Sequence, residues 1–312
     1  MKSGWRSLAI ILAAGVCTVM LPMLAPGSSD DETKPNGKGM GTLLNPGNGN
    51  GGEAKAAQPG SGTNNGIFYH GGPVMLGTVN VYYIWYGNWS GNSATTILTD
   101  FANSIGGSPY YNINTTYNDG SSHSLSNSIH YVVSTTMSST THGTSLSDAD
   151  IQTIVMDAIN SKALPLDGNA VYFVLTSADV TASSGFCTKY CGWHTYGTIS
   201  GLTTRIKYAF VGDPSRCPSA CMAQTTGPNG NAGADGMASV IAHELEEAAS
   251  DPQLNAWYDR RGYENADKCA WTFGTTYTTS NGALANMRLG TRDYLIQRNW
   301  VNASGGYCAL SY

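Results

Sequence analysis

The chain has 312 residues, of which 12% are charged, and its formal net charge is −5. This length allows one or two domains, and the shortage of basic residues argues against nucleic acid as a partner. Residues 1–25 have the pattern of a secretory signal, because Lys2 and Arg6 precede an apolar run and a cleavage site at Met23-Leu24-Ala25 follows it. An uncleaved membrane anchor is the alternative. No later stretch is long and apolar enough to span a membrane, so we expect an exported protein.

Cysteine usage agrees with export. Six of the seven cysteines follow the leader, and an even number in an exported chain predicts disulfide bonds. We expect the pairs Cys187–Cys191, Cys217–Cys221 and Cys269–Cys308. The alternative that the spacing permits is a zinc site held by Cys187, Cys191, Cys217 and Cys221.

The composition divides the rest of the chain into two parts. Residues 26–65 are rich in Gly, Asn, Pro and Ser and contain few aliphatic side chains, so they predict a disordered linker. Residues 66–312 have the composition of one globular domain that is large enough to bury a full core.

The predicted elements of this domain alternate between strands and helices. β-branched and aromatic runs predict strands at 79–86, 129–133 and 171–176. Apolar residues at helical spacing predict helices at 94–105 and after Ser147, which is a capping residue. Charged and apolar residues alternate at 205–211, which predicts a half-exposed or edge strand. The order predicts an α/β or α+β domain in which helices flank a mixed sheet.

The stretch from Asp235 to Pro252 predicts the helix around which the rest is organised. Asp235 is a suitable N-cap, and Pro252 disfavours helical geometry before it, so the helix should end near Ser250. His243 and Glu247 are four residues apart and project to the same side. The zinc motif His-Glu-x-x-His has this spacing, and a carboxylate can replace its second histidine. The alternative is a solvated acidic helix face without a metal.

Several carboxylates follow this helix, and they suggest further ligands. A catalytic zinc site needs a third protein ligand from a later segment and one open position. We expect Glu264 or Asp267 to supply that ligand. Glu244 would then be the general base, and His194 or a nearby tyrosine could stabilise an oxyanion. Calcium is the less favoured metal, because it prefers oxygen ligands and gives His243 no role.

Distinctive motifs are spread over residues 66–312. They include Ile84-Trp-Tyr-Gly-Asn-Trp89, Gly185-Phe-Cys-Thr-Lys-Tyr-Cys-Gly-Trp-His194, Cys217-Pro-Ser-Ala-Cys221 and Asn255-Ala-Trp-Tyr258. On these residues the chain resembles the EXORDIUM (phosphate-induced) family of secreted plant and microbial proteins. The resemblance implies an extracellular location in the apoplast or cell wall and a link to growth, but no settled biochemical activity. The strand order before the site helix also resembles that of zincin metallopeptidases.

Two functions of different class follow from these observations. The first is a zinc-dependent hydrolase whose partner is an extracellular peptide or protein. The second is a non-catalytic protein that binds a cell-wall component or a receptor, with a structural metal or acidic site. Exposed aromatic residues would carry that binding, and the candidates are Trp85, Trp89, Trp193, Trp257, Trp271 and Trp300.

Overall fold

The computed structural model describes Met1 and residues 34–38, 66–199 and 204–312. The predicted signal and most of the predicted linker therefore lie outside the described residues. Within the described ranges, no helix has both the length and the hydropathy needed to cross a membrane.

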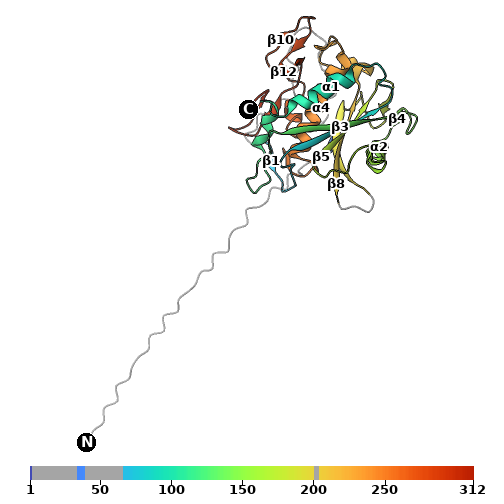
Figure 1. The fold of residues 1–312 in the computed structure, drawn as a ribbon. Helices are drawn as coiled ribbons and strands as arrows, with labels where there is room; N and C mark the ends of the chain where they lie inside the picture. Colours follow the sequence, from blue (N-terminus) through green and yellow to red (C-terminus); the bar gives the residue numbers. More distant parts are fainter. Residues whose placement is uncertain (2–33, 39–65, 200–203) are drawn as a thin grey trace. The chain divides into compact units, whose positions relative to one another are not determined.

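A five-stranded sheet lies at the centre of the domain, with the strand order β3-β2-β5-β8-β7 (Figure 1). Its strands are β2 (Val79–Tyr86), β3 (Ile129–Met137), β5 (Ala170–Thr176), β7 (Gly192–Thr198) and β8 (Arg205–Gly212). The pairs β3–β2, β2–β5 and β5–β8 are parallel, whereas β7 runs antiparallel to β8. Every residue of β5 is buried, as expected for a central strand.

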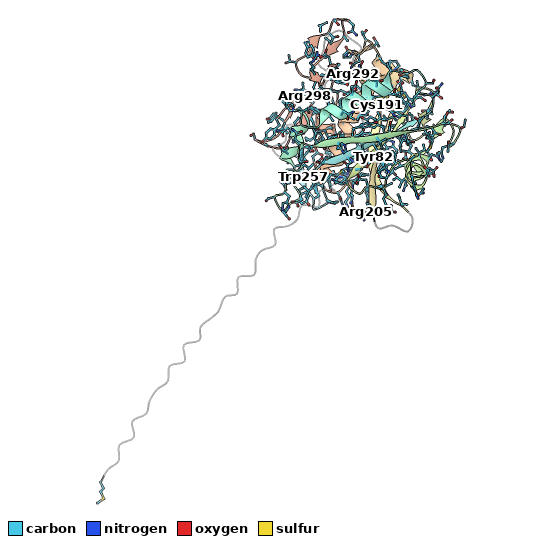
Figure 2. All side chains as sticks on the ribbon, in the orientation of Figure 1. Tyr82, Cys191, Arg205, Trp257, Arg292 and Arg298 are labelled. Atoms are coloured by element: carbon cyan, nitrogen blue, oxygen red, sulfur yellow. A yellow bond between two sulfur atoms is a disulfide. The ribbon has the colours of Figure 1, made fainter. Side chains whose placement is uncertain are left out.

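Helices cover both faces of this sheet and so produce a mixed α/β domain. Helices α1 (Ala94–Ile105) and α4 (Ala232–Ser250) share one core with alternate strand residues such as Tyr83 and Phe173. Helix α2 (Asp148–Asn160) shares the other core with the intervening residues, among them Tyr82 (Figure 2). The predicted cap of α2 is confirmed, because Ser147 forms a capping box with Asp150.

The remaining elements are short, and most of them lie in the loop-rich C-terminal part. They are β1 (Phe68–Tyr69), η1 (Tyr111–Thr116), β4 (Ser145–Leu146), β6 (Thr181–Ala182), η2 (Pro214–Arg216), α3 (Pro218–Cys221), β9 (Trp257–Tyr258), η3 (Asp267–Cys269), β10 (Tyr277–Thr278), β11 (Leu284–Ala285), β12 (Met287–Leu289), β13 (Arg292–Tyr294), β14 (Asn299–Val301) and β15 (Tyr307–Ala309). These elements are too small to form a core of their own. The short elements η1, η2 and β13 contact α4, β12 contacts α1, and β4 contacts α2.

The strand predicted at 205–211 is confirmed as β8, but its predicted half-exposed or edge position is wrong. Strand β8 lies between β5 and β7. Its Lys207 is buried, and the ammonium group donates a hydrogen bond to the carbonyl oxygen of Gly168. The edge strand beside β8 is β7, and the opposite edge is β3. The sequence did not predict β7, because its glycines and mixed polar residues lack the alternation of a strand.

Three disulfide bonds are present: Cys187–Cys217, Cys191–Cys221 and Cys269–Cys308. The third pair was predicted, but the pairs Cys187–Cys191 and Cys217–Cys221 are wrong, and the bonds also exclude the four-cysteine zinc site. The reason is geometric. Residues 187–191 form a turn in which the Cys187 amide donates to the carbonyl of Tyr190, and this turn lies against α3. Cys187 therefore meets Cys217, the residue before α3, and Cys191 meets Cys221, the last residue of α3.

Candidate metal centre

Helix α4 carries the site, and it is longer than predicted. It begins at Ala232, after Asn231, whose side chain accepts a hydrogen bond from the amide of Ala234 at 3.1 Å. The predicted N-cap, Asp235, lies inside the first turn instead. The glycines around Asn231 suggested a loop, so this start was missed. The helix ends at Ser250 as predicted.

The acidic face of α4 is buried, so the alternative of a solvated face is wrong. Five carboxylates of this region are at most 2% exposed: Glu244, Glu246, Glu247, Asp251 and Glu264. A buried carboxylate without a counterion costs several kcal/mol. Among the described residues, the ion pairs of this group are made by His194 and His243. The surplus of buried negative charge calls for bound protons or a bound cation.

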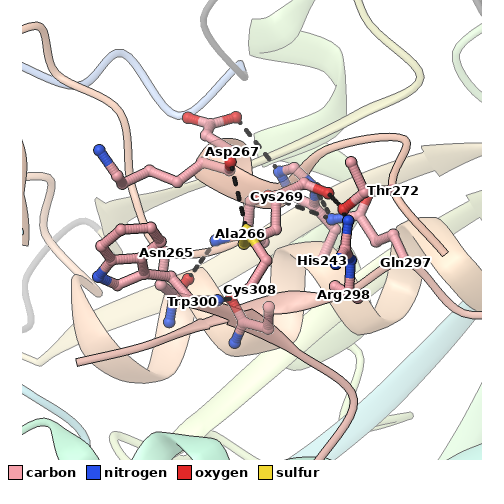
Figure 3. Close-up of a disulfide and its surroundings, with 12 residues drawn as sticks. His243, Asn265, Ala266, Asp267, Cys269, Thr272, Gln297, Arg298, Trp300 and Cys308 are labelled. Atoms are coloured by element: carbon pink, nitrogen blue, oxygen red, sulfur yellow. Dashed lines mark hydrogen bonds and ion pairs between the residues drawn. A yellow bond between two sulfur atoms is a disulfide. The ribbon is translucent and has the colours of Figure 1, made fainter. Parts of the chain in front are cut away.

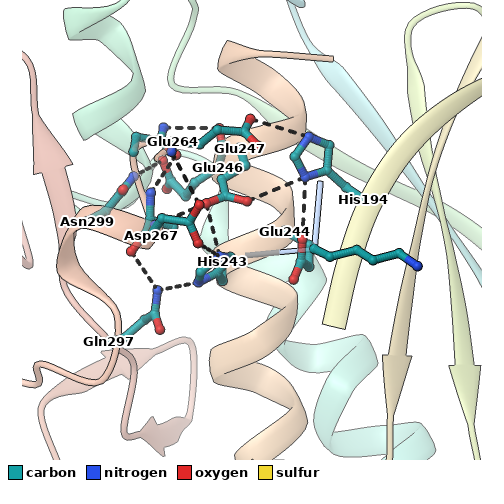
Figure 4. Close-up of polar contacts among 12 residues, drawn as sticks. His194, His243, Glu244, Glu246, Glu247, Glu264, Asp267, Gln297 and Asn299 are labelled. Carbon is teal, nitrogen blue, oxygen red and sulfur yellow. Dashed lines mark hydrogen bonds and ion pairs between the residues drawn. The ribbon is translucent and has the colours of Figure 1, made fainter. Parts of the chain in front are cut away.

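The first set of donors, the outer group, consists of His243, Glu247 and Asp267 (Figure 4). His243 Nε2 lies 3.0 Å from Glu247 Oε1 and 3.5 Å from Asp267 Oδ1. The other ring nitrogen of His243 contacts the side-chain amide of Gln297 at 2.7 Å. Helix α4 and η3 thus bring together three residues that the sequence predicted as ligands.

The disulfide Cys269–Cys308 holds η3 in place beside this group (Figure 3). Asp267 and Cys269 lie in the same single turn, so the covalent link to β15 also fixes the Asp267 carboxylate. The backbone amide of Asp267 donates to Glu247 Oε1 at 3.0 Å, which joins η3 to α4.

The second set of donors, the inner group, consists of His194, Glu244 and Glu247. His194 Nδ1 lies 3.4 Å from Glu244 Oε2 and 3.5 Å from Glu247 Oε2, and His194 Nε2 lies 3.5 Å from Glu264 Oε1. His194 comes from β7, where Gly192 lets α4 approach, because a Cβ there would lie 2.9 Å from Glu244 Oε1.

The donors of the inner group and Glu264 lack hydrogen bonds. Among the described residues, His194 Nδ1, Glu244 Oε2, Glu247 Oε2 and Glu264 Oε1 are buried without a hydrogen-bond partner. Separations of 3.4–3.5 Å are long for charge-assisted hydrogen bonds, which measure about 2.7–2.9 Å. Tetrahedral zinc bonds of about 2.0–2.1 Å would place neighbouring ligand atoms about 3.3 Å apart. Nitrogen and carboxylate donors at these distances fit a metal ion such as zinc.

Without a metal, the same residues share protons unevenly. Burial raises the pKa of Glu244 to about 7, against the opposing effect of His194. Burial acts the same way on Glu247, but the facing histidines, His243 first, lower its pKa to about 2. Burial also raises the pKa of Glu264 well above its usual range. The shared residue Glu247 therefore carries the firmest negative charge of the cluster.

The two groups differ in their access to solvent. An open pocket is lined by His243, Glu244 and Asp267, and its apolar wall includes Trp271 and Phe273. His194 and Glu247 do not belong to its lining, and both are fully buried. Catalytic zinc sites keep an open position, whereas structural sites are closed. The outer group therefore has the access of a catalytic site.

Other predicted residues lie apart from the outer group. Glu264 faces His194 rather than His243. Asp259 forms an ion pair with Lys268, with 3.0 Å between Asp259 Oδ2 and Lys268 Nζ. His194 is buried on β7 and does not reach the pocket.

Five of the six candidate tryptophans are buried, which argues against an exposed aromatic platform, and only Trp271 lines the pocket.

Two residues of the cluster were not predicted. Gln297 contacts His243, and Glu246 accepts a hydrogen bond from the side chain of Asn299 at 2.7 Å. No motif marks Gln297, because it comes from a loop before β14. Glu246 could have been found from its position, since it projects away from Glu244 and Glu247 toward the apolar side of α4.

Comparisons with known proteins assign the chain to a family. Residues 67–296 match the family model described as "Phosphate-induced protein 1 conserved region". The chain is 33% identical to Protein EXORDIUM-like 3 of Arabidopsis thaliana, over 77% of this chain and 81% of that one. It is 32% identical to Protein EXORDIUM-like 5 of the same plant, over 74% of each chain. It is 27% identical to Protein PHOSPHATE-INDUCED 1 of Nicotiana tabacum, over 61% of this chain and 66% of that one. No solved structure matches significantly. The chain therefore belongs to the EXORDIUM-like, phosphate-induced protein family.

Proposed function

We propose that this protein is an extracellular zinc-dependent hydrolase that cleaves peptide bonds. The observation that carries the proposal is the outer group, in which His243, Glu247 and Asp267 converge at the wall of an open pocket. The three disulfides are consistent with an extracellular location in the apoplast or cell wall.

In this proposal the outer group holds the zinc ion through His243 Nε2, Glu247 Oε1 and Asp267 Oδ1. A metal ligand at Nε2 requires the proton of His243 at Nδ1. Gln297 must then turn the oxygen of its amide toward Nδ1, so that it accepts this proton and fixes the orientation of the ring. Gln297 is therefore a positioning residue.

A zinc ion bound there would polarise the scissile carbonyl and lower the pKa of an attacking water. Glu244 follows His243 in the chain and lines the same pocket, so it can accept the proton of that water. His194 contacts Glu244 from the buried side and does not touch the pocket, so we assign it to positioning Glu244 rather than to an oxyanion. Two anionic ligands would reduce the charge of the zinc ion, which favours slow or narrow chemistry.

Glu244→Gln is the sharpest test of this proposal. The full chain, secreted with its disulfides intact, is compared with the variant for zinc content, thermal stability and turnover of a peptide library. Loss of a general base should lower turnover by about 10² to 10⁴, with zinc content unchanged. Glu246→Gln is the matched control, because Glu246 is equally buried on the same helix but faces Asn299. It should change stability and leave turnover per folded molecule intact.

The same measurements can contradict the proposal. A wild-type protein that holds no transition metal after secretion into zinc-supplied medium would end it, and calcium in its place would reassign the cofactor. Equal activity of wild type and Glu244→Gln would remove Glu244 from the reaction.

The second candidate function is a non-catalytic binding protein with a structural metal. One observation favours it: two donors of the inner group, His194 and Glu247, are closed to solvent, as the ligands of structural zinc sites are. In that case zinc would be present, and neither wild type nor Glu244→Gln would turn over any substrate. Loss of zinc in His194→Ala but not in His243→Ala would support this second function.

A further inference from the structure

The outer edge of β7 is in contact with another part of the chain. Strand β7 pairs with β8 on one side only, so its other side carries backbone groups without a strand partner in the described residues. One of them, the amide of His194, donates to the carbonyl of Gly37 at 2.9 Å. Sheet edges of this kind accept extended chains through backbone hydrogen bonds.

The contact at Gly37 admits only a glycine. Gly37 is buried and has a φ of +69°, and a Cβ at this position would lie 1.9 Å from the carbonyl oxygen of His194. The positive φ alone, or the short Cβ distance alone, would disfavour any residue other than glycine at position 37. Pro35 is buried as well, whereas Lys34 and Asn36 are exposed. Residues 34–37 thus alternate between exposed and buried positions, and the chain bends at Gly37 and Lys38.

The next residue, Lys38, lies in a cation site built by β7 and its neighbours. Its ammonium group forms an ion pair with Asp148, at the start of α2. The same nitrogen lies 5.5 Å from the ring centroid of Tyr190 and 5.6 Å from that of Trp193. A carboxylate with two aromatic rings is suited to bind a lysine or arginine side chain.

This cation site is held together by contacts that do not involve Lys38. The hydroxyl of Ser184 donates to Asp148 Oδ1 at 2.6 Å and lies 2.5 Å from the hydroxyl of Tyr190. Trp193 stacks on Phe210 of β8 with 6.0 Å between the ring centroids. The geometry of the site therefore does not depend on Lys38 alone.

We propose that the outer edge of β7 is a binding site for peptides that bend at a glycine followed by a lysine or arginine, and that residues 34–38 fill it in the resting protein. The site adjoins the proposed catalytic pocket, because Lys38 lines that pocket together with His243 and Glu244. A chain bound there would be a candidate substrate, but the binding itself requires neither a metal nor turnover.

The test uses the full chain and a fluorescein-labelled, end-blocked peptide of sequence Lys-Pro-Asn-Gly-Lys, in the presence of EDTA. In wild type, the tethered segment competes at an effective concentration in the millimolar range. Gly37→Val prevents that segment from docking, so the variant should bind the peptide at least about tenfold more tightly than wild type. Lys34→Ala is the matched control, because Lys34 is exposed, and it should bind as wild type does.

Two further comparisons identify the site. Asp148→Asn in the Gly37→Val background should weaken peptide binding, as should replacing the peptide's last lysine with alanine. A peptide in which valine replaces glycine should not bind. Circular dichroism checks that each variant is folded. Equal binding to wild type and Gly37→Val, or tight binding of the valine peptide, would overturn the proposal. Because EDTA is present throughout, an inactive or metal-free protein would leave this result unaffected.

Discussion

The inner and outer groups use the same kinds of donor atom and share Glu247, yet they differ in access. His243 and Asp267 of the outer group keep 12% and 6% of their side-chain surface exposed, whereas His194 of the inner group has none. The difference shows that donor chemistry alone does not separate a catalytic site from a structural one. Here the separation comes from the pocket beside His243 and from the buried position of His194 on strand β7.

The largest effect should come from the residue that both groups share. Glu247→Ala removes a carboxylate whose two oxygens face one histidine each. Breaking a buried ion pair costs about 3–5 kcal/mol, so we expect the free energy of unfolding to fall by this amount, with complete loss of zinc. Urea denaturation and elemental analysis measure both. Retention of zinc would show that Glu247 is not a ligand.

The two histidines should separate the groups. We expect His243→Ala to abolish zinc binding with a modest loss of stability, since this ring is partly exposed. His194→Ala should keep zinc but lower the free energy of unfolding by about 2 kcal/mol or more, because it leaves buried carboxylates unopposed. Zinc titration and thermal unfolding of both variants would measure these changes in zinc binding and stability. The reverse pattern would place the metal in the inner group.

A smaller effect is expected at Gln297, which orients the outer histidine. Removing a residue that orients a metal ligand lowers metal affinity by about 10- to 100-fold. Gln297→Ala should show this loss in a competition with a zinc chelator. Gln253→Ala, a change at an amide that contacts Arg205, is the control and should leave affinity unchanged. Equal affinities in both variants would remove Gln297 from the site.

The smallest effect concerns pH and the protein without metal. The pKa of Glu244 is about 7 in the folded state, against an ordinary value of 4.5, so the folded state binds its proton more tightly. That contribution to stability is complete below about pH 4.5 and is lost as the pH rises through 7. Urea denaturation with EDTA should therefore show a falling free energy of unfolding from pH 5 to pH 7.5. Zinc should reduce the decline, and an equal decline with zinc would contradict the metal centre.

Much of the fold was predictable because local pattern and tertiary environment agree. The strands β2 and β5 and the helices α1 and α2 have clear sequence patterns, and Ser147 is a clear N-cap residue of α2. Strand β7 was missed because its position at the edge comes from pairing with β8, not from its own residues. The disulfide pairing was missed for a related reason, since it depends on how the turn at 187–191 meets α3.

The site was predictable only along the helix that carries it. The spacing of His243 and Glu247 indicated a shared face, and the later acidic residues suggested Asp267. Nothing in the spacing could show that His194, some fifty residues earlier, would face Glu244, since a β-strand and a helix bring them together. The burial of the acidic face was also invisible, because it depends on loops that pack over α4 only in the folded domain.

The pairing of Cys187 with Cys217 and of Cys191 with Cys221 has a consequence for biosynthesis. During vectorial synthesis, Cys187 and Cys191 become available together before either native partner has emerged. The two neighbouring thiols can first form a non-native Cys187–Cys191 disulfide. Thiol–disulfide exchange must open that bond before the two native disulfides can form. Such reshuffling takes seconds to hours, depending on oxidant and isomerase. Maturation of this protein should therefore depend on a disulfide isomerase, and its yield should fall where export supplies an oxidase alone.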